Sequence, residues 1–539
     1  MPVKKTTARP RTKKSDEIIS YNPATLEEVG RVRVTPPSEL DSIVQTASEA
    51  QRRWGQVPIR ERAKLIQRVA AHVLDNHERF AEFITRENGK TLVESYLMEV
   101  LPVLDTFTYV AKHGPQILSR ERIPTPQLIM KHKKHYFDYT PYGVIGIISP
   151  WNYPFSIPAG EVAIALVAGN SVILKPSPLT PLIGEKIKHA FDQAGLPEGV
   201  LTIVHGDAPI GSAMSAHEGI GTLFFTGSVE TGRKVGEAAG RALKPTVLEL
   251  GGKDAAIVCS DADLDRAVRG VMWGGCANSG QTCAGIERVY VSRSRYDEFV
   301  DRASELAERL KPGDPMEPET QVGPFTDTSQ YEKVVRQVDE AIEHGAKRLT
   351  GGPADVGMAG KWYAPSIVTD VDHSMSLMRD ETFGPIVPVM PFDDEQDAVK
   401  LANDSEFGLG ASIWSKDTNR ATKLASELES GSVWINDHMY SHGFAQLPWG
   451  GAKRSGVGVT HSKFGFYACV RPKLLSVDSG RMPVPFWHPY DERLRKSFDA
   501  VLNALYAPNA GEKLRTVLSR RSEFKGIIDR ARNPNGPSV

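Results

Sequence analysis

At 539 residues the chain is too long for one ordinary hydrophobic core, so two or three packed units are expected. Its formal net charge of -1 provides no basic excess to neutralise phosphates, which argues against nucleic acid as a partner. Its four scattered cysteines, none in a Cys-x-x-Cys pair, argue against a disulfide framework and a zinc cluster, so we expect no metal and a reducing, cytoplasmic compartment.

The N-terminal part of the chain is predicted to be mainly helical. Residues 1–17 are basic but no apolar stretch follows them, which indicates a flexible leader and not a secretory signal. Residues 38–109 place apolar side chains at three- and four-residue spacing, as amphipathic helices do. The alternating, aromatic-rich segment 132–143 predicts an exposed hairpin.

From Val144 onwards, short β-branched runs alternate with helical stretches. This alternation predicts βαβ units, a parallel sheet and an α/β fold. A second α/β stretch extends over about residues 263–436. The longest mainly apolar run, residues 162–174, is interrupted by polar residues and is too short to span a bilayer.

The composition changes again after about Gly480. A segment rich in proline and aromatic residues leads into an amphipathic helix over residues 491–506, and residues 531–539 are expected to be disordered. The apolar face of this helix either packs on the protein or a partner subunit, or makes a peripheral contact with a membrane. That face contains Leu494, Phe498, Val501, Leu502 and Leu505.

Three polar residues lie in contexts that suggest chemistry. Cys283 is surrounded by small residues in GQTCAG, Glu249 ends an apolar strand in LELGG, and Asn152 follows another strand in PWNYP. Separately, each has an ordinary explanation: a buried small side chain, a misplaced charge or a turn residue. Together they supply a nucleophile, a general base and an oxyanion donor.

Seven motifs occur in an order that resembles the aldehyde dehydrogenase superfamily, across about residues 18–476. They are PWNYP, LKPSPLTP, FTGSVETG, LELGGKD, GQTCAGIERVYV, ETFGPIVPV and LPWGGAKRSGVG. The resemblance implies an α/β aldehyde dehydrogenase-like fold with a Rossmann-like cofactor domain, an α/β catalytic domain and a small β bridging element for oligomerisation. The implied boundaries are 18–125 with 144–251 for the cofactor domain, 126–143 with 457–476 for the bridging element, 252–456 for the catalytic domain and 477–539 for a C-terminal extension.

The resemblance also implies the reaction. Cys283 would attack an aldehyde, the Asn152 amide and the Cys283 N–H would hold the oxyanion, and Glu249 would activate water to hydrolyse the thioester. A CoA-acylating relative should lack the carboxylate that Glu249 provides. A catalytically silent nucleotide-binding homologue is the alternative from another functional class.

The cofactor implied is NAD(P)+, although no G-x-G-x-x-G fingerprint occurs. FTGSVETG would replace that fingerprint, with a helix N-terminus at the pyrophosphate. NAD-preferring relatives often carry a Glu where this chain has Pro178, so the expectation leans slightly towards NADP+. The implied cofactor residues are Pro150, Trp151, Lys175, Ser177, Gly227, Ser228, Gly232, Glu381 and Phe383.

The substrate tunnel implied by the resemblance has small liners and aromatic walls, which favours a medium, long or bulky apolar aldehyde. Its residues would be Tyr153, Ser156, Gly160, Thr282, Ala284, Gly443 and Trp449. Succinate semialdehyde is the alternative substrate. Its dehydrogenases usually have a second Cys at the position of Gly285, and Arg288 is only weak support for a carboxylate-bearing substrate.

The resemblance further implies self-association. The segment 132–142 and the run 463–471 resemble the family's bridging hairpin and its strand partner. An exposed strand edge favours pairing, so a homodimer or homotetramer is expected.

Overall fold

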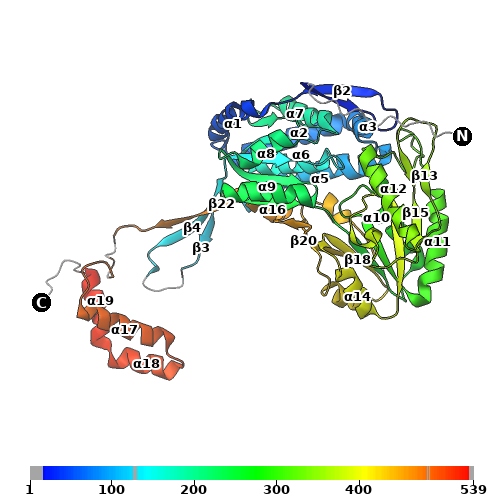
Figure 1. The fold of residues 1–539 in the computed structure, drawn as a ribbon. Helices are drawn as coiled ribbons and strands as arrows, with labels where there is room; N and C mark the ends of the chain where they lie inside the picture. The colour runs from blue at the N-terminus through cyan, green and yellow to red at the C-terminus, as the bar shows by residue number, and fades with distance from the viewer. Residues whose placement is uncertain (1–15, 126–129, 482–483, 485, 533–539) are drawn as a thin grey trace. The chain divides into compact units, whose positions relative to one another are not determined.

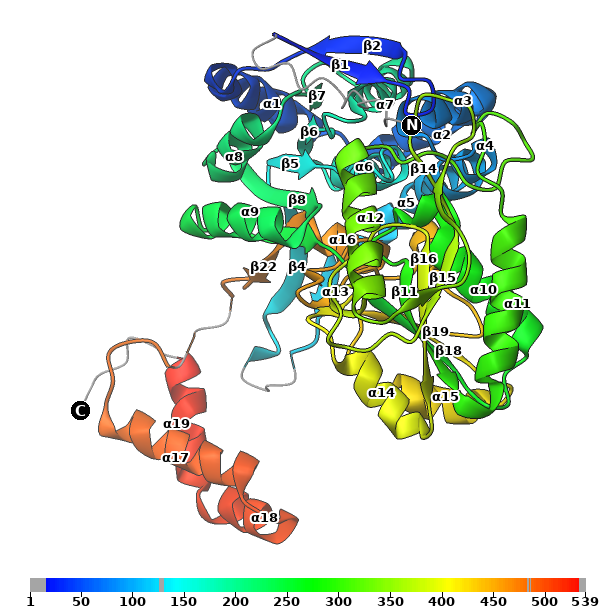
Figure 2. The same cartoon turned by 45° about the vertical axis from the view of Figure 1, so that its right-hand side comes forward.

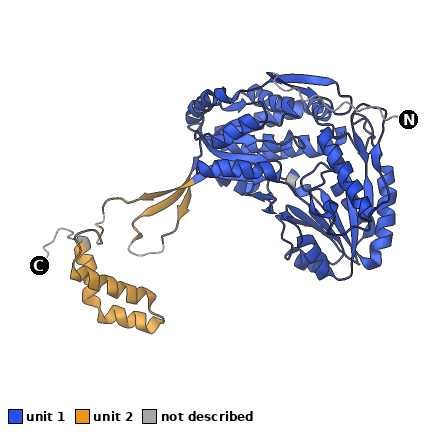
Figure 3. Ribbon diagram, viewed as in Figure 1, with its two compact units in different colours: residues 1–118, 140–471 blue, residues 119–139, 472–539 orange. Residues whose placement is uncertain are grey.

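The computed structural model describes residues 16–125, 130–481, 484 and 486–532, and these form two compact units (Figures 1 and 3). The first contains residues 1–118 and 140–471, and the second contains residues 119–139 and 472–539. Most of the predicted leader, residues 1–15, and the end of the tail, residues 533–539, lie outside the described residues. The finer division of the chain into cofactor, catalytic and bridging domains remains a prediction.

A six-stranded sheet forms the first half of unit 1. Four neighbouring pairs are parallel, and only the short edge strand runs antiparallel. In sheet order the strands are β21 (Gly456–Val457), β9 (Thr246–Glu249), β8 (Ile220–Thr226), β5 (Val144–Ile148), β6 (Ser171–Lys175) and β7 (Leu201–Ile203). The predicted parallel α/β architecture is therefore confirmed.

Helices cover both faces of this sheet (Figure 2). One face packs against α1 (Leu40–Trp54), α8 (Ala208–Ala216) and α9 (Val229–Arg241) in a single apolar cluster. On the other face α6 (Ser156–Val167) contacts β5 and β6, next to α5 (Leu101–Ile117) and α2 (Ile59–Asp75). The other helices of this half are α3 (His77–Asn88), α4 (Leu92–Ser95), a π-helical turn (Tyr96–Val100) and α7 (Pro181–Gln193).

A seven-stranded sheet forms the second half of unit 1. Only its edge strand β12 is antiparallel. In sheet order the strands are β12 (Lys347–Arg348), β15 (Ser366–Thr369), β16 (Ile386–Phe392), β11 (Ile286–Ser292), β10 (Asp254–Val258), β18 (Gly410–Trp414) and β19 (Ser432–Ile435).

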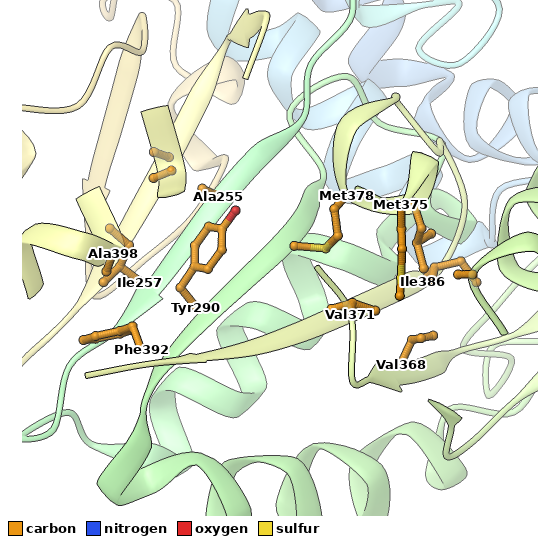
Figure 4. Close-up of a cluster of buried hydrophobic side chains, with 14 of the residues drawn as sticks. Ala255, Ile257, Tyr290, Val368, Val371, Met375, Met378, Ile386, Phe392 and Ala398 are labelled. Carbon is orange, nitrogen blue, oxygen red and sulfur yellow. The ribbon is translucent and has the colours of Figure 1, made fainter. Parts of the chain in front are cut away.

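Alternate residues of β10 belong to different cores, because successive side chains of a strand point to opposite faces. Ala255 and Ile257 join the cluster shown in Figure 4, whereas Ala256 and Val258 join the cluster on the other face. Burial on both faces explains why the four residues after Asp254 in β10 are all apolar and do not alternate. The flanking helices are α10 (Leu264–Cys276), α11 (Tyr296–Arg309), α12 (Thr328–Glu343), α13 (Ser376–Arg379), α14 (Glu395–Asn403) and α15 (Thr418–Ala425).

Small antiparallel pairs complete unit 1. They are β1 (Glu17–Tyr21) with β2 (Glu28–Arg33), β13 (Gly352–Ala354) with β14 (Trp362–Ala364), and β17 (Phe407–Gly408) with β20 (Ala452–Lys453).

A three-stranded sheet contains β4 (Lys134–Pro141) between β3 (Glu121–Ile123) and β22 (Val470–Val477). Two predictions are corrected here. The segment 132–143 is not a hairpin by itself, since β4 is one continuous strand that pairs with β3. The predicted strand partner over 463–471 is mostly helix α16 (Ser462–Ala468), because Phe466 is buried against α5, and the strand begins only at Val470.

The second unit also contains three helices, α17 (Glu492–Tyr506), α18 (Ala510–Ser519) and α19 (Arg521–Arg532). The first confirms the helix predicted over residues 491–506. Across the described residues, no helix is both long and apolar enough to cross a membrane.

Candidate active site

Strand order in the six-stranded sheet brings several predicted residues to one edge. The chain forms β5, β6 and β7 in one direction and then returns to place β8 on the other side of β5. Ligands of open parallel sheets bind outside the carboxyl ends of the strands at such a reversal. Lys175 ends β6 and Glu249 ends β9, while Pro150, Trp151 and Asn152 follow β5.

The strand register places these ends level with one another. Ile148 is paired with Lys175 across β5 and β6, and Thr226 is paired with Glu249 across β8 and β9. Gly227 and Ser228 follow Thr226 and lead directly into α9. The local sequence places each residue at a strand end, and the parallel register then gathers them at one edge.

The N-terminus of α9 is open to solvent and is suited to an anion. The Ser228 hydroxyl caps the helix by accepting from the Thr231 N–H at 3.3 Å, and Ser228 itself is exposed. The unpaired N–H groups of a first helical turn attract phosphates. The two glycines of the motif also have a packing role. A Cβ on Gly227 would lie 2.7 Å from the Phe225 ring, and one on Gly232 would lie 2.4 Å from Leu250.

Lys175 is buried at the same edge, where it donates to the carbonyl oxygens of Pro176 at 3.1 Å and Gly206 at 2.9 Å. An ammonium group has three donors, so one remains for a ligand. Burial lowers the pKa of Lys175 to about 8, opposed by the negative charge of Asp207. Ser177, two residues further along the chain, is also buried, and its hydroxyl accepts from the Leu179 N–H at 3.2 Å.

Glu381 and Phe383 approach from the loop before β16. The Glu381 carboxylate accepts from the Gly252 N–H at 3.1 Å, and the Phe383 ring packs edge-on against Trp151 at 5.6 Å between centroids. Burial raises the pKa of Glu381 to about 7, with a further contribution from Glu287 that Lys333 opposes. Residues from both halves of unit 1 therefore meet beside the strand ends.

Gly251 and Gly252, which follow Glu249, allow the two halves of unit 1 to approach closely. A Cβ on Gly251 would lie 2.7 Å from a Glu381 carboxylate oxygen, and one on Gly252 would lie 2.1 Å from the Cys283 carbonyl oxygen. A larger residue in place of Gly252 would displace the Cys283 backbone, and one in place of Gly251 would displace the Glu381 carboxylate. The LELGG motif thus places Glu249, from the first half of unit 1, close enough to Cys283, from the second half, for its charge to act on the thiol.

Cys283 lies in a loop between a strained turn and β11. Asn278 and Ser279 adopt left-handed backbone angles, with φ of 54° and 56°, which cost free energy in residues other than glycine. The thiol is half-buried, and loss of water raises its pKa. The charges of Asp254, Glu249 and Glu381 raise the pKa further, so the resting group is a thiol and not a thiolate.

Asn152 is held rigidly against the loop that carries the thiol. Its side-chain amide donates to the Gln281 carbonyl oxygen at 3.0 Å, which leaves a second N–H for another acceptor. Its own carbonyl oxygen accepts from Lys90 at 2.9 Å and from the Asn278 side chain at 3.0 Å. The buried ion pair of Lys90 with Glu99, 2.6 Å long, completes this support.

These supporting residues were not predicted from the sequence. Glu99 also accepts from the backbone N–H groups of Phe155, at 3.2 Å, and Ser156, at 2.6 Å, so it fixes the turn after Asn152. The local sequence gave no signal for them, because Lys90 and Glu99 stand among other polar residues in NGKTLVESYLMEV, and Lys90 lies in the loop after α3.

Glu249 occupies an apolar environment. It is buried, and burial raises its pKa well above the usual range of a carboxyl group. The negative charge of Glu161 on α6 raises the pKa further, while a hydrogen bond from Trp449 opposes the shift. A carboxyl group with a raised pKa is a stronger base once it ionises, which suits proton abstraction from water.

A pocket of about 270 Å³ opens onto Cys283. Five predicted tunnel residues line it: Tyr153, Thr282, Ala284, Gly443 and Trp449. The Tyr153 hydroxyl is 2.8 Å from that of Thr282, which orients the aromatic wall. The lining residues that the sequence did not identify are Leu97, Met98, Leu101, Pro102, Asp105, Ile157, Trp273, Met439, Tyr440 and Phe444.

Two predicted tunnel residues lie elsewhere. α6 presents Ile157 to the pocket, whereas Ser156 donates its backbone N–H to Glu99 and Gly160 faces α5. A Cβ on Gly160 would lie 3.4 Å from the Thr106 methyl group, which is an ordinary contact, so this position faces α5 but packing does not require glycine there. Neither residue enlarges the pocket as predicted.

The lining of the pocket contains little charge. Arg288 is buried away from it and donates to the carbonyl oxygens of Lys253 and Ala402, each at 2.9 Å. Among the described residues that line the pocket, the only charged side chain is that of Asp105. This lining offers no cation to a carboxylate-bearing aldehyde.

Comparison with known proteins gives a consistent result. Residues 11–475 match the Aldehyde dehydrogenase family. A 4,4'-diapolycopene aldehyde oxidase from Methylomonas sp is 37% identical over 513 residues, covering 94% of this chain and 95% of that protein. Retinaldehyde dehydrogenase 3 of Rattus norvegicus is 37% identical over 451 residues, covering 83% of this chain and 86% of that protein.

A solved structure, Mycobacterium tuberculosis aldehyde dehydrogenase complexed with NAD+, is similar with a TM-score of 0.82. It is 32% identical and covers 86% of this chain and 95% of that chain. The family match ends at residue 475, before α17. The Methylomonas match covers 94% of this chain, which is more than residues 1–476 provide, so it includes part of the C-terminal extension.

Proposed function

Because this chain belongs to the aldehyde dehydrogenase family, we propose that it oxidises a long or bulky apolar aldehyde to the acid, through a thioester on Cys283. Membership makes it an NAD(P)-dependent oxidoreductase of small-molecule aldehydes. The observation that carries the substrate class is the apolar pocket that opens onto Cys283. The Methylomonas and retinaldehyde relatives, named for apolar aldehydes, support the same class.

The reaction follows from the groups around the thiol. The Cys283 thiol gives its proton to solvent as its sulfur adds to the aldehyde carbonyl carbon, and the second amide N–H of Asn152 with the Cys283 N–H stabilises the resulting oxyanion. One oxyanion donor contributes about 3–4 kcal/mol. NAD(P)+, when bound, supplies the hydride acceptor. Glu249 then takes a proton from water, whose oxygen attacks the thioester carbonyl and displaces the Cys283 sulfur.

The strand-end residues fit a dinucleotide. The N-terminus of α9 with Ser228 suits the pyrophosphate, Lys175 and Glu381 offer partners to the riboses, and Phe383 with Trp151 forms an apolar wall. Pro178 provides no carboxylate to repel the 2′-phosphate of NADP+, but the Asp207 charge that acts on Lys175 would oppose a 2′-phosphate. NAD(P)+ is therefore the proposed cofactor, and the slight preference for NADP+ remains open to measurement.

The proposal is tested with decanal, retinal, propanal and succinate semialdehyde, each with NAD+ and with NADP+. We expect kcat/KM for decanal and retinal to exceed that for succinate semialdehyde at least tenfold, because each buried methylene contributes about 0.8 kcal/mol. A preference for succinate semialdehyde would refute the substrate class. No NAD(P)H formation with any aldehyde would indicate a catalytically silent homologue.

A charged substitution on the pocket wall sharpens this test. Leu101→Asp should lower kcat/KM for decanal by about tenfold or more and leave propanal within about twofold, because only the longer chain reaches this wall. Leu74→Asp is a matched control, since Leu74 on α2 is 55% exposed, Leu101 is 57% exposed, and Leu74 lies outside the pocket.

We also propose that the chain forms a homodimer or homotetramer through the free edge of β22. This strand lies at the edge of its sheet and carries the exposed side chains of Leu474 and Val477. Light scattering at micromolar concentration should give two or four times the chain mass of 59.1 kDa. Leu474→Pro should lower that mass, because proline interrupts strand pairing; a wild-type monomer would contradict the proposal.

A further inference from the structure

The C-terminal extension has a framework of its own. α17 packs on both α18 and α19, with Leu494 and Ala500 buried. Ion pairs tie α17 and the residue before it to α19, Arg493 with Asp529 at 3.1 Å and Arg530 with Asp491 at 2.9 Å. The buried contacts of the three helices leave other apolar side chains on the surface.

Those side chains form what we call the apolar patch: Leu502, Leu505 and Tyr506 on α17, and Leu514, Val517 and Leu518 on α18. Each is between 44% and 75% exposed. On each helix they recur at three- or four-residue spacing, so they lie on one face of that helix. Exposed apolar side chains are ordinary when scattered, but a group of six on two packed helices indicates a contact surface.

The unpaired charges beside the apolar patch are mainly positive. Four acidic residues, Asp491, Glu492, Asp499 and Asp529, are paired with arginines, and two, Glu512 and Glu523, are in no ion pair. Within the described part of α17–α19, five cations take part in no ion pair: Lys496, Lys513, Arg515, Arg521 and Lys525. Lys513 and Arg515 flank Leu514 directly, and Arg521 follows Leu518 by three residues.

An apolar face bordered by unpaired cations matches a lipid bilayer with anionic headgroups. It matches a second copy of the same surface poorly, because two-fold pairing would bring the cations of both copies together. α17 has 15 residues and α18 has 10, and a helix needs about 20 to span the hydrocarbon core, so contact must be along the surface.

We propose that the helices α17 and α18 bind the surface of an anionic lipid bilayer, with the apolar patch inserted and Lys513 and Arg515 at the headgroups. The bilayer contact does not depend on the reaction proposed above. If both hold, the enzyme is concentrated where apolar aldehydes dissolve.

The test is co-sedimentation of the full chain with vesicles of phosphatidylcholine alone, or with about 30% phosphatidylglycerol. We expect binding to the anionic vesicles, at least tenfold weaker binding to phosphatidylcholine alone, and release of the bound protein by high salt. Absence of binding to anionic vesicles by the full chain overturns the proposal.

Two variants separate the parts of the proposal. Leu505→Asp with Leu514→Asp should reduce vesicle binding at least tenfold, and Lys513→Gln with Arg515→Gln should reduce the preference for anionic vesicles. Leu243→Asp is the control, because Leu243 lies in the other unit and is 94% exposed.

Retention of a helical circular dichroism spectrum and of activity on propanal shows that each variant is folded. Unchanged vesicle binding by the Leu505 and Leu514 variant overturns the proposal. So does a change in oligomeric mass without a change in vesicle binding, because the patch would then be a protein contact.

Discussion

Cys283→Ser is expected to lower kcat/KM for every oxidised aldehyde by on the order of 10⁴-fold or more, as loss of a nucleophile does in other enzymes that use covalent catalysis. Cys283 is the only cysteine among the described residues that line the pocket. A serine hydroxyl has the position but not the acidity of the thiol, so it is a much weaker nucleophile at neutral pH. NAD(P)H formation measures the loss.

Nucleotide binding should persist in this variant, because the strand-end residues are untouched. Quenching of Trp151 fluorescence provides the readout, since Trp151 packs against Phe383 at that edge. Cys259→Ser is the control: Cys259 is buried in the core of the seven-stranded sheet, so activity should remain while the melting temperature falls. Substantial aldehyde oxidation by Cys283→Ser would refute the covalent mechanism.

The raised pKa of Cys283 gives a pH dependence for the free enzyme. The thiolate fraction grows with pH and does not level off near the usual pKa of about 8.5. Alkylation by iodoacetamide should therefore keep rising through pH 9, by about tenfold per unit. A plateau below pH 8 would contradict the environment described for this thiol.

Glu249→Gln is expected to separate the two halves of the reaction. The first turnover should give a rapid burst of NAD(P)H, followed by steady turnover about 10²–10⁴-fold slower, because the thioester forms without its hydrolytic base. Glutamine retains the shape of glutamate and can still accept from Trp449. Stopped-flow absorbance shows the burst, and denaturing mass spectrometry shows the acyl-enzyme.

The pH profile provides a second readout. Glu249 acts in its ionised form, so the rate of hydrolysis rises with pH as the carboxyl group ionises. Because the pKa of Glu249 is raised, this rising limb of the pH profile lies at higher pH than for an ordinary carboxyl group. The limb should be absent in Glu249→Gln. Glu161→Gln is the matched control: it removes a neighbouring negative charge, so it should move the limb to lower pH and give no burst. Turnover unaffected in Glu249→Gln would exclude its role as base.

Much of the fold was predictable because its signals are local. Val144–Ile148, Ser171–Lys175 and Asp254–Val258 are short apolar runs bounded by polar residues, and each forms a buried parallel strand. The run 463–471 was expected to be a strand because it resembles a family segment, but most of it is helix α16, on which Phe466 is buried against Gly114 of α5. The resemblance alone did not fix the secondary structure of this run.

The candidate site likewise combines residues that the sequence identified with residues that only the tertiary structure revealed. Sequence motifs identified Cys283, Glu249 and Asn152, but the wall of the pocket depends on the direction in which each helix presents its side chains. Gly160 was expected in the tunnel because relatives for short aldehydes often carry a bulky aromatic residue there, yet Ile157, three residues earlier on α6, lines the pocket while Gly160 faces Thr106 of α5. Rotation of a helix about its axis is set by packing and not by local sequence.

By itself the sequence determined the parallel α/β architecture and the candidate reacting residues with the strand ends that carry them, since these follow from hydrophobic period and from short motifs that resemble a known family. Only the tertiary structure brought Gly252 against the Cys283 backbone, paired Lys90 with Glu99 beside Asn152 and placed Arg288 away from the pocket that opens onto Cys283. Each of these contacts joins segments distant in the chain, or depends on the direction of a buried side chain. Such contacts form only when the sheets and helices pack together, and no local pattern encodes them.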